Sequence, residues 1–196
     1  MPEEDIETGE LKEQLHHTVE HGQGGPRWTQ VLSVSTALLA VLAAVASLLS
    51  GAYSNDALLA KNDGVLQQAK ASDAWSYFQA KGTRAAVYAV QADGLAKSEP
   101  AAAARMRQEA DRYRDEQKEI QQQARELEKK VQEDDERAER LLERHHQFAR
   151  AVTFSQIAIA LAAIAALMKK KWLWFVGLGS GAVGVVFLIR GLAGAG

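Results

Sequence analysis

Residues 28–51 read WTQVLSVSTALLAVLAAVASLLSG, a stretch that contains no charged side chain. About 20 apolar residues are enough for a helix to cross the roughly 30 Å of hydrocarbon in a bilayer. The segment before it is rich in Asp and Glu, whereas a signal peptide begins with a short basic region. We therefore expect residues 28–51 to be an uncleaved transmembrane helix, and residues 1–27 an acidic, partly helical segment.

Two further apolar segments lie near the other end of the chain. Residues 151–168 read AVTFSQIAIALAAIAALM, and residues 172–190 read WLWFVGLGSGAVGVVFLIR. Only Lys169, Lys170 and Lys171 separate them, which predicts two antiparallel transmembrane helices joined by a basic turn and followed by a tail of residues 191–196. The alternative is a single re-entrant unit, which protein would have to cover at that depth.

The lysine turn also predicts the orientation. Basic residues near the ends of spans favour the cytoplasmic side, and Trp residues favour the membrane interface. Lys169–Lys171 precede Trp172, and Arg27 precedes Trp28 in the same way. In a chain with three spans, the start of the first span and the turn between the second and third lie on the same side of the membrane. We expect a cytoplasmic N-terminus and, on the other side, the loop between the first two spans, which would be periplasmic in the inner membrane of a Gram-negative bacterium. Arginines at the membrane end of that loop oppose this assignment.

Residues 52–150 contain nearly equal numbers of acidic and basic side chains, which is typical of solvent-exposed helices. Mostly apolar side chains recur at alternating intervals of four and three from Met106 to Val152, a heptad pattern that Gln117, Asp134 and His145 interrupt. A smaller matching pattern runs from Ala71 to Ala96, and Pro100 suits the first turn of a new helix. We expect an antiparallel coiled-coil hairpin with arms 52–97 and 100–150, and hence an all-α integral membrane protein with three transmembrane helices.

Folding the chain about Ser98–Pro100 predicts which side chains meet in the hairpin core. The pattern places large side chains opposite small ones, as interdigitated packing requires. The predicted core residues are Trp75, Phe78, Tyr113 and Ile120. Near the membrane the core becomes polar, and a Lys61–Asp134 ion pair would lie there. This polar region is either a hydrated base or a buried layer that sets the register of the two arms.

The run Ser72-Asp-Ala-Trp-Ser-Tyr-Phe-Gln-Ala-Lys81 resembles a segment of a bacterial membrane-protein family, Domain of Unknown Function 4337. The resemblance implies an acidic N-terminus, an Ala/Leu-rich span, a charged helix and a terminal pair of spans, and it carries no catalytic assignment. Four residues in and after this run fall outside the predicted core, where they form either a solvated face or a surface for a protein partner. They are Asp73, Tyr77, Lys81 and Tyr88.

Small side chains in the apolar segments are spaced as close helix packing requires. We expect them to pack the three spans together and to bind a second protomer. In the first span they are Ala40, Ala44 and Ser47, and in the third they are Gly177, Gly181 and Gly184.

Catalytic and ligand-binding patterns are sparse. The sequence has no cysteine and a net charge of −2, which gives no reason to expect nucleic-acid binding. It lacks the P-loop, Rossmann, nucleophile-elbow and HExxH motifs. His17 and His21 would share one helix face, but a structural zinc site normally needs four protein ligands. We expect no enzyme activity, no cofactor and no metal, with His17 and His21 the only candidate ligands.

These patterns favour a homo-oligomeric membrane scaffold that presents a coiled-coil stalk to partners, with membrane lipids around its spans. The alternative is an oligomeric channel whose pore is lined by the first span. The spans contain no buried charge of the kind that pumps and secondary transporters use. Conductance in planar bilayers distinguishes a channel from a scaffold.

Overall fold

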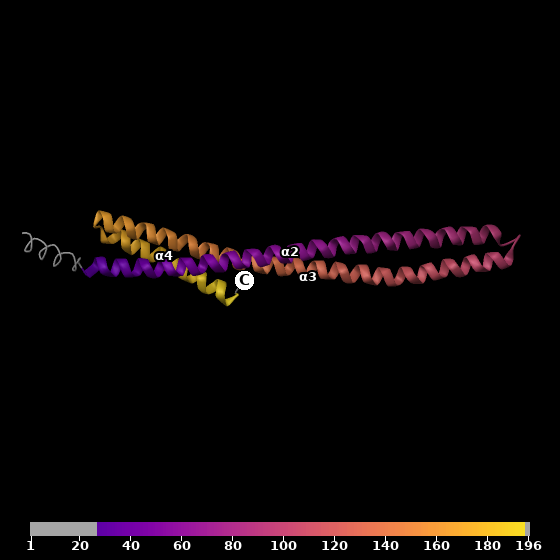
Figure 1. The fold of residues 1–196 in the computed structure, drawn as a ribbon, viewed down its shortest axis with the longest axis horizontal. Helices are drawn as coiled ribbons and strands as arrows, with labels where there is room; N and C mark the ends of the chain where they lie inside the picture. The colour runs from indigo at the N-terminus through magenta and orange to yellow at the C-terminus, as the bar shows by residue number, and fades with distance from the viewer. Residues whose placement is uncertain (1–26, 195–196) are drawn as a thin grey trace, which may run out of the picture. The chain divides into compact units, whose positions relative to one another are not determined.

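The computed structural model describes residues 27–194, and every regular element in this range is an α-helix (Figure 1). Helix α2 spans Arg27–Leu95, α3 spans Pro100–Met168 and α4 spans Lys171–Ala193. Each of these helices contains a stretch long and apolar enough to cross a membrane. The all-helical fold with three long helices is as predicted, while residues 1–26, with the candidate ligands His17 and His21, lie outside the described residues.

The turns between the helices follow from local backbone chemistry. Glu99 precedes α3, and its carbonyl oxygen accepts a hydrogen bond from the amide of Ala103 at 3.0 Å. Pro100 begins the helix, where the amide hydrogen that proline lacks would have no intrahelical partner. The helix break therefore lies where the sequence places it.

The turn from α3 to α4 is a Schellman motif. The amide of Lys170 donates to the carbonyl of Ala165 at 3.2 Å, and the amide of Lys169 lies 3.4 Å from the carbonyl of Ala166. Lys169 has a φ of 52°, a left-handed conformation that glycine normally occupies at this position. A lysine in this place costs about 1–2 kcal/mol of backbone strain.

The described chain divides into two compact units, which we treat separately. The apolar unit comprises residues 27–51 and 144–194. The charged unit comprises residues 52–143, and thus one section of α2 and one section of α3.

Small side chains form the interior of the apolar unit. On α3 the buried residues recur at intervals of four and three, and on α2 they share a second stripe. Leu32 packs with Ala162 and Ala165, and Trp28 and Trp174 cover this cluster. The α3 stripe consists of Ala151, Ser155, Ala158, Ala162 and Ala165, and the α2 stripe of Leu32, Leu39, Ala43, Ala46 and Ser50.

Alanines also dominate the interior of the charged unit, where α2 and α3 run antiparallel. Lys61 contacts Asp135, and further along α2 Asp93 contacts Arg107. The residues nearest to complete burial on both helices are almost all alanines, which allow the two helices to approach closely. They are Ala57, Ala60, Ala71, Ala85 and Ala92 on α2, and Ala103, Ala110, Ala124 and Ala138 on α3.

The predicted core residues of the charged unit have unequal burial. Ile120 is buried, whereas Trp75, Phe78 and Tyr113 are half-buried at the edges of the interface. The large rings do not fit between two helices held close by alanines, so they lie along the sides of the contact. The rings of Trp75 and Phe78 meet edge to face, with their centroids 5.3 Å apart.

Candidate functional site

Glycines of α4 make a close helix contact in the apolar unit. Four buried glycines, Gly177, Gly181, Gly184 and Gly191, lie along one side of this helix. A Cβ atom on Gly177 would lie 3.1 Å from the carbonyl oxygen of Ala158, and one on Gly184 would lie 3.1 Å from that of Ala151. The backbones of α3 and α4 therefore touch, and a larger side chain would separate them.

Side chains complete this contact on both sides of the glycine stripe. Phe148 is fully buried and its ring lies where a Cβ atom of Gly191 would be, within 2.9 Å. The hydroxyl of Ser180 donates to the carbonyl of Phe154 at 2.9 Å, and the ring of Phe154 stacks on that of Phe187. Sequence reasoning identified three of the glycines and missed Gly191, although its spacing of seven from Gly184 continues the stripe.

Polar side chains connect α2 to the other two helices of the apolar unit. The indole nitrogen of Trp174 donates to the hydroxyl of Ser35 at 3.2 Å. Nδ1 of His145 lies 2.9 Å from the carbonyl oxygen of Ser50 and 3.0 Å from its hydroxyl. A carbonyl only accepts hydrogen bonds, so this geometry is consistent with a proton on Nδ1. His145 thus contacts α2.

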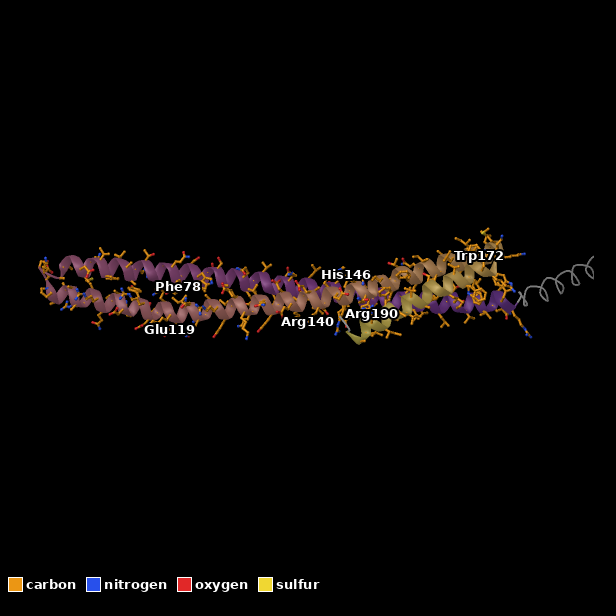
Figure 2. All side chains as sticks on the ribbon, turned by 180° about the vertical axis from the view of Figure 1, so that it is seen from behind. Phe78, Glu119, Arg140, His146, Trp172 and Arg190 are labelled. Atoms are coloured by element: carbon orange, nitrogen blue, oxygen red, sulfur yellow. The ribbon has the colours of Figure 1, made fainter. Side chains whose placement is uncertain are left out.

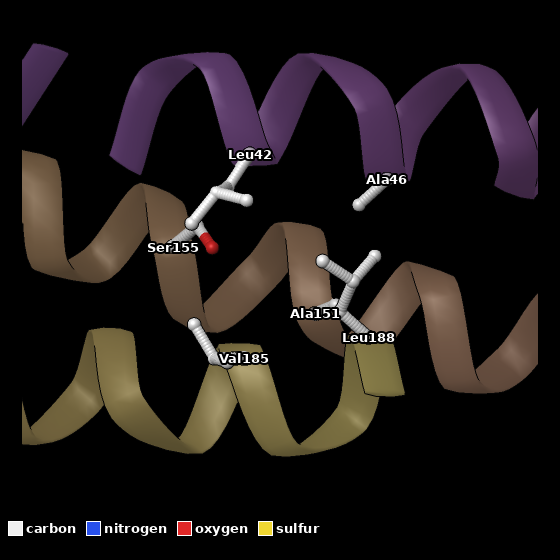
Figure 3. Close-up of a pocket in the computed structure, with 7 residues that line it drawn as sticks. Leu42, Ala46, Ala151, Ser155, Val185 and Leu188 are labelled. Atoms are coloured by element: carbon white, nitrogen blue, oxygen red, sulfur yellow. The ribbon is translucent and has the colours of Figure 1, made fainter. Parts of the chain in front are cut away.

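A narrow crevice lies among the three helices (Figure 3). Leu42 and Ala46 of α2, Ala151 and Ser155 of α3, and Val185 and Leu188 of α4 line it, together with Gly184. The crevice has no room for a water molecule. It is a seam between packed helices and offers no space for a ligand.

The predicted oligomerisation residues divide into two groups. Gly177, Gly181 and Gly184 are buried inside the protomer, whereas the small residues of the first span, Ala40, Ala44 and Ser47, are exposed. The face of α2 that packs inside its own protomer is the adjacent one, which carries the buried residues Ala43 and Ala46.

In the charged unit, Lys81 is the centre of a polar cluster. Its side chain is buried and its ammonium group forms an ion pair with Glu116 of α3. The same group lies 5.1 Å from the ring centre of Tyr77 and 4.9 Å from that of Tyr113, close enough for cation–π attraction. The ring of Tyr88 also stacks on that of Tyr113, with centroids 5.6 Å apart.

This arrangement corrects the predicted partner surface. Asp73 and Tyr77 are exposed as expected, but Lys81 is buried and Tyr88 is half-buried. The long aliphatic stem of lysine allows it to cover an apolar interface while its charge finds a partner at the edge. Two of the four residues therefore hold α2 and α3 together and leave little surface for another protein.

A glycine beside Lys81 allows a second polar contact. The amide nitrogen of Gln117 donates to the carbonyl oxygen of Phe78 at 3.1 Å. A Cβ atom on Gly82 would lie 2.5 Å from that nitrogen, so glycine leaves the space through which Gln117 reaches the α2 backbone. Seven residues before Gly82, and so about two turns away, the indole nitrogen of Trp75 donates to Glu128 at 2.9 Å. We call these contacts, with the Lys81–Glu116 pair, the register cluster.

The predicted Lys61–Asp134 ion pair is wrong by one residue. Lys61 binds Asp135 at 2.7 Å, and both side chains are about half exposed. Asp134 lies instead beside Gly64, where a Cβ atom would meet its side chain at 3.6 Å. An exposed pair of this kind stabilises little, because water screens the charges.

The electrostatics of the register cluster follow from the ion pair. The hydrogen bond from Lys81 lowers the pKa of Glu116 below its ordinary value, and nearby Arg112 acts in the same direction. The bond to Glu116, and then that to Tyr77, raises the pKa of Lys81. Both groups are therefore held in their charged forms. Within residues 27–194 no three His, Asp or Glu side chains are grouped as metal ligands would be.

The residues of the register cluster on α2 belong to the run Ser72–Lys81 and its neighbour Gly82, the segment that carries the family resemblance. A model of one protein family matches residues 28–194, which covers α2, α3 and α4. The chain belongs to the family described as Domain of unknown function (DUF4337). No curated protein and no solved structure matches this DUF4337 chain.

The glycine contact of this DUF4337 protein leads to the first prediction. Gly184→Val should destabilise the apolar unit by about 1–3 kcal/mol, a typical cost of overpacking, because the new side chain would press on Ser155 and the carbonyl of Ala151. Gly179→Val is the matched control, since a Cβ atom there meets nothing within 4 Å. Thermal unfolding in detergent measures both variants, and equal melting temperatures would show that α3 and α4 are not in backbone contact.

The register cluster leads to a pH-dependent prediction. Because the pKa of Glu116 is lowered, its contribution to stability is present above the unfolded-state pKa of about 4.3 and is lost as the pH falls through the folded-state pKa. Because the pKa of Lys81 is raised, its contribution is present below the unfolded-state pKa of about 10.4 and is lost as the pH rises through the folded-state value. Lys81→Gln should therefore melt at a lower temperature than the wild type between these limits.

Outside these limits the two melting temperatures should converge. Lys70→Gln, at an exposed position of the same helix, is the control and should follow the wild type throughout. Circular dichroism across the pH range gives the measurement. A difference between wild type and Lys81→Gln that does not vary with pH would show that the ion pair does not contribute.

Proposed function

We propose that this protein is a homo-oligomeric membrane scaffold whose apolar unit lies in the bilayer and whose charged unit forms an extramembrane coiled-coil hairpin that binds partners. The outward side chains of the apolar unit support the membrane placement. Leu38 and Leu48 of α2 are 62% and 75% exposed, and Phe175 of α4 is 62% exposed. Such an exterior is unfavourable in water and suits lipid chains.

The exterior of α3 in the charged unit supports an aqueous location. Neighbouring charges pair along the helix surface, as between Arg114 and Asp111 and between Lys118 and Asp115, both at 2.8 Å. Pairs three or four residues apart stabilise a solvated helix. A helix with this surface belongs outside the hydrocarbon.

The polar side chains inside the charged unit support a structural role over a catalytic one. Lys81, Glu116 and Gln117 are engaged in contacts between α2 and α3. A catalytic acid or base needs a position from which it can reach a substrate, whereas these groups face one another across the helix interface. We infer that the protein acts by binding.

One observation carries the homo-oligomer: Ala40, Ala44 and Ser47 are exposed on α2, while the glycines of α4 are already buried inside the protomer. Lipid provides no hydrophobic drive between helices, so association in a bilayer relies on small residues that let backbones approach. Within residues 27–194, the small face of α2 stays exposed. A second protomer would supply such a close contact.

We predict that Ala40→Leu combined with Ala44→Leu abolishes the oligomer, because the added bulk prevents close approach of two α2 helices. Val41→Leu with Val45→Leu enlarges the adjacent side of the same helix and should leave the oligomer intact. Mass photometry in detergent or native nanodiscs measures particle mass. If the variant with Ala40→Leu and Ala44→Leu keeps the wild-type mass, the small face is not the interface between protomers, and this part of the proposal is overturned.

We further propose that the lysine turn and the N-terminus lie on the cytoplasmic side, with the charged unit on the opposite side. Lys169 has a left-handed backbone conformation, in which glycine is normally found. A charged residue thus stands at this position of the turn despite the backbone strain. Trp172, at the start of α4, lies far along that helix from Arg190, as residues at two interfaces would (Figure 2). Basic residues and Trp next to a span are typical of a cytoplasmic interface.

Cysteine labelling tests this orientation, since the chain has no cysteine of its own. Ser98→Cys, in the exposed turn between α2 and α3, should react with a membrane-impermeant maleimide in intact cells. Lys170→Cys should react only after the membrane is permeabilised. The reverse pattern would invert the topology.

A further inference from the structure

The two helices of the charged unit differ strongly in charge. Residues 100–143 include 23 charged side chains, whereas residues 52–95 of α2 include eight. Both helices contribute an inner side to the same interface, so the difference lies in their outer sides. The outer side of α2 therefore carries far fewer charges than that of α3.

Exposed apolar side chains show the same asymmetry. In the charged unit, Leu142 is the one large exposed apolar residue of α3, at 44%. On α2 there are seven, each at least half exposed. They are Leu58, Leu59, Val65, Leu66, Tyr77, Val87 and Val90.

The outer side of α2 has an uninterrupted heptad pattern. Ten positions recur at alternating intervals of four and three, every one of them is exposed, and none is charged. The inner, buried residues, such as Ala71 and Ala85, fall on the other side of the helix. We call these ten positions the outer seam: Leu58, Asn62, Val65, Ala69, Ser72, Ser76, Gln79, Thr83, Ala86 and Val90.

A seam with this spacing is what a helix presents to a partner helix in a coiled coil. Its large apolar side chains lie at the two ends, with Leu58 and Val65 at one end and Val90 at the other. Between Val65 and Val90 the seam is uncharged and mixed, with four Ala or Ser residues that would permit close approach of a second helix and the polar residues Gln79 and Thr83. Solvent-facing helices have no need of such a pattern, and the outer side of α3 in the same unit has charges throughout.

We propose that the outer seam of α2 binds the outer seam of a second copy of this chain in a parallel coiled coil. The inference rests on the proposed membrane anchoring, since copies inserted in one bilayer with one topology have the same direction. Identical residues then meet at the same level, so Ala69 faces Ala69 of the partner copy. Asn62 would face its own counterpart, a polar pair that favours two parallel strands in register.

Charge selects a second copy over a different partner. The seam contains no acidic or basic side chain, so it offers nothing to attract a charged surface. Another uncharged seam with the same spacing matches it, and each copy carries one. The charged exterior of α3 would remain in water on both sides of the paired helices.

Disulfide cross-linking of the full-length protein in its native membrane tests the proposal. Ala69→Cys lies on the seam and Lys70→Cys lies beside it, also exposed. Disulfides require Cα atoms within about 7 Å, so mild oxidation should give Ala69→Cys at least about fivefold more covalent dimer than Lys70→Cys. Similar yields from the two positions, or no dimer from either, would overturn the proposal.

Charged substitutions give a second, independent measurement. Val65 and Val90 are 69% and 72% exposed, so Val65→Glu with Val90→Glu leaves the protomer interior untouched. In the Ala69→Cys background this change should reduce the cross-linked dimer at least about tenfold, because carboxylates would face one another in the seam. The helix content by circular dichroism should stay that of the parent. A dimer yield that is unaffected would contradict pairing through the seam.

The outcome also separates this interface from the one proposed in the membrane. If Ala40→Leu with Ala44→Leu lowers the particle mass while Ala69→Cys does not cross-link, the oligomer stands and the outer seam is excluded as its contact. If the wild-type protein has the mass of one chain and Ala69→Cys does not cross-link, both proposals fail. Cross-linking at Ala69 that persists when the membrane face is altered supports the seam by itself.

Discussion

Backbone contact between α3 and α4 at the glycine stripe is the constraint on which the apolar unit depends. Where Gly177 and Gly184 approach the carbonyls of Ala158 and Ala151, only hydrogen fits between the helices. The buried stripe of α3 therefore serves both neighbours: Ala151 and Ala158 meet the glycines of α4, while Ala162 and Ala165 pack with Leu32 of α2. On α2, the small residues Ala40, Ala44 and Ser47 remain exposed in the part of the chain that the structure describes.

In the charged unit the register between α2 and α3 must be set by something other than alanines, because alanine stripes alone specify register poorly. One alanine stripe packs against another almost equally well after a shift by a heptad. Contacts between unlike polar groups do not tolerate such a shift: Lys81 needs Glu116, and Gln117 needs the gap at Gly82 to reach Phe78. Buried polar groups are known to set register in coiled coils. These contacts between α2 and α3 give the run Ser72–Lys81 a physical role within the protomer.

The two helices of the charged unit are thus unequal. The one that carries most of the charge, α3, suits water on its outer side, whereas α2 combines a buried inner side with an uncharged heptad pattern on the other. In both units, therefore, α2 has more surface suited to helix packing than its own protomer covers. A protein that assembles through α2 and exposes α3 would present its charged surface to partners, which is the arrangement expected of a scaffold.

Much of this architecture is readable from the sequence. The lengths of the three apolar segments, the break at Pro100, the lysine turn and the family membership depend on local composition and spacing, which a single chain displays directly. The heptad spacing of mostly apolar residues also indicated that α2 and α3 each have one side that packs against another helix. Glycine spacing identified most of the α3–α4 contact, because few residues other than glycine permit it.

Only the tertiary structure decided which of several similar residues makes each contact. Ala43 is buried and Ala44 exposed, although both are small and adjacent, because a rotation of one helix by a single position exchanges them. Asp135 replaces Asp134 as the partner of Lys61 for the same reason. Lys81 turns inward because Tyr77, Tyr113 and Glu116 converge on it from two helices. The sequence by itself determined the helices and their apolar and charged segments, since those depend on neighbours in the chain. Side-chain partners depend on the rotation of one helix against another, which the packed structure alone defines.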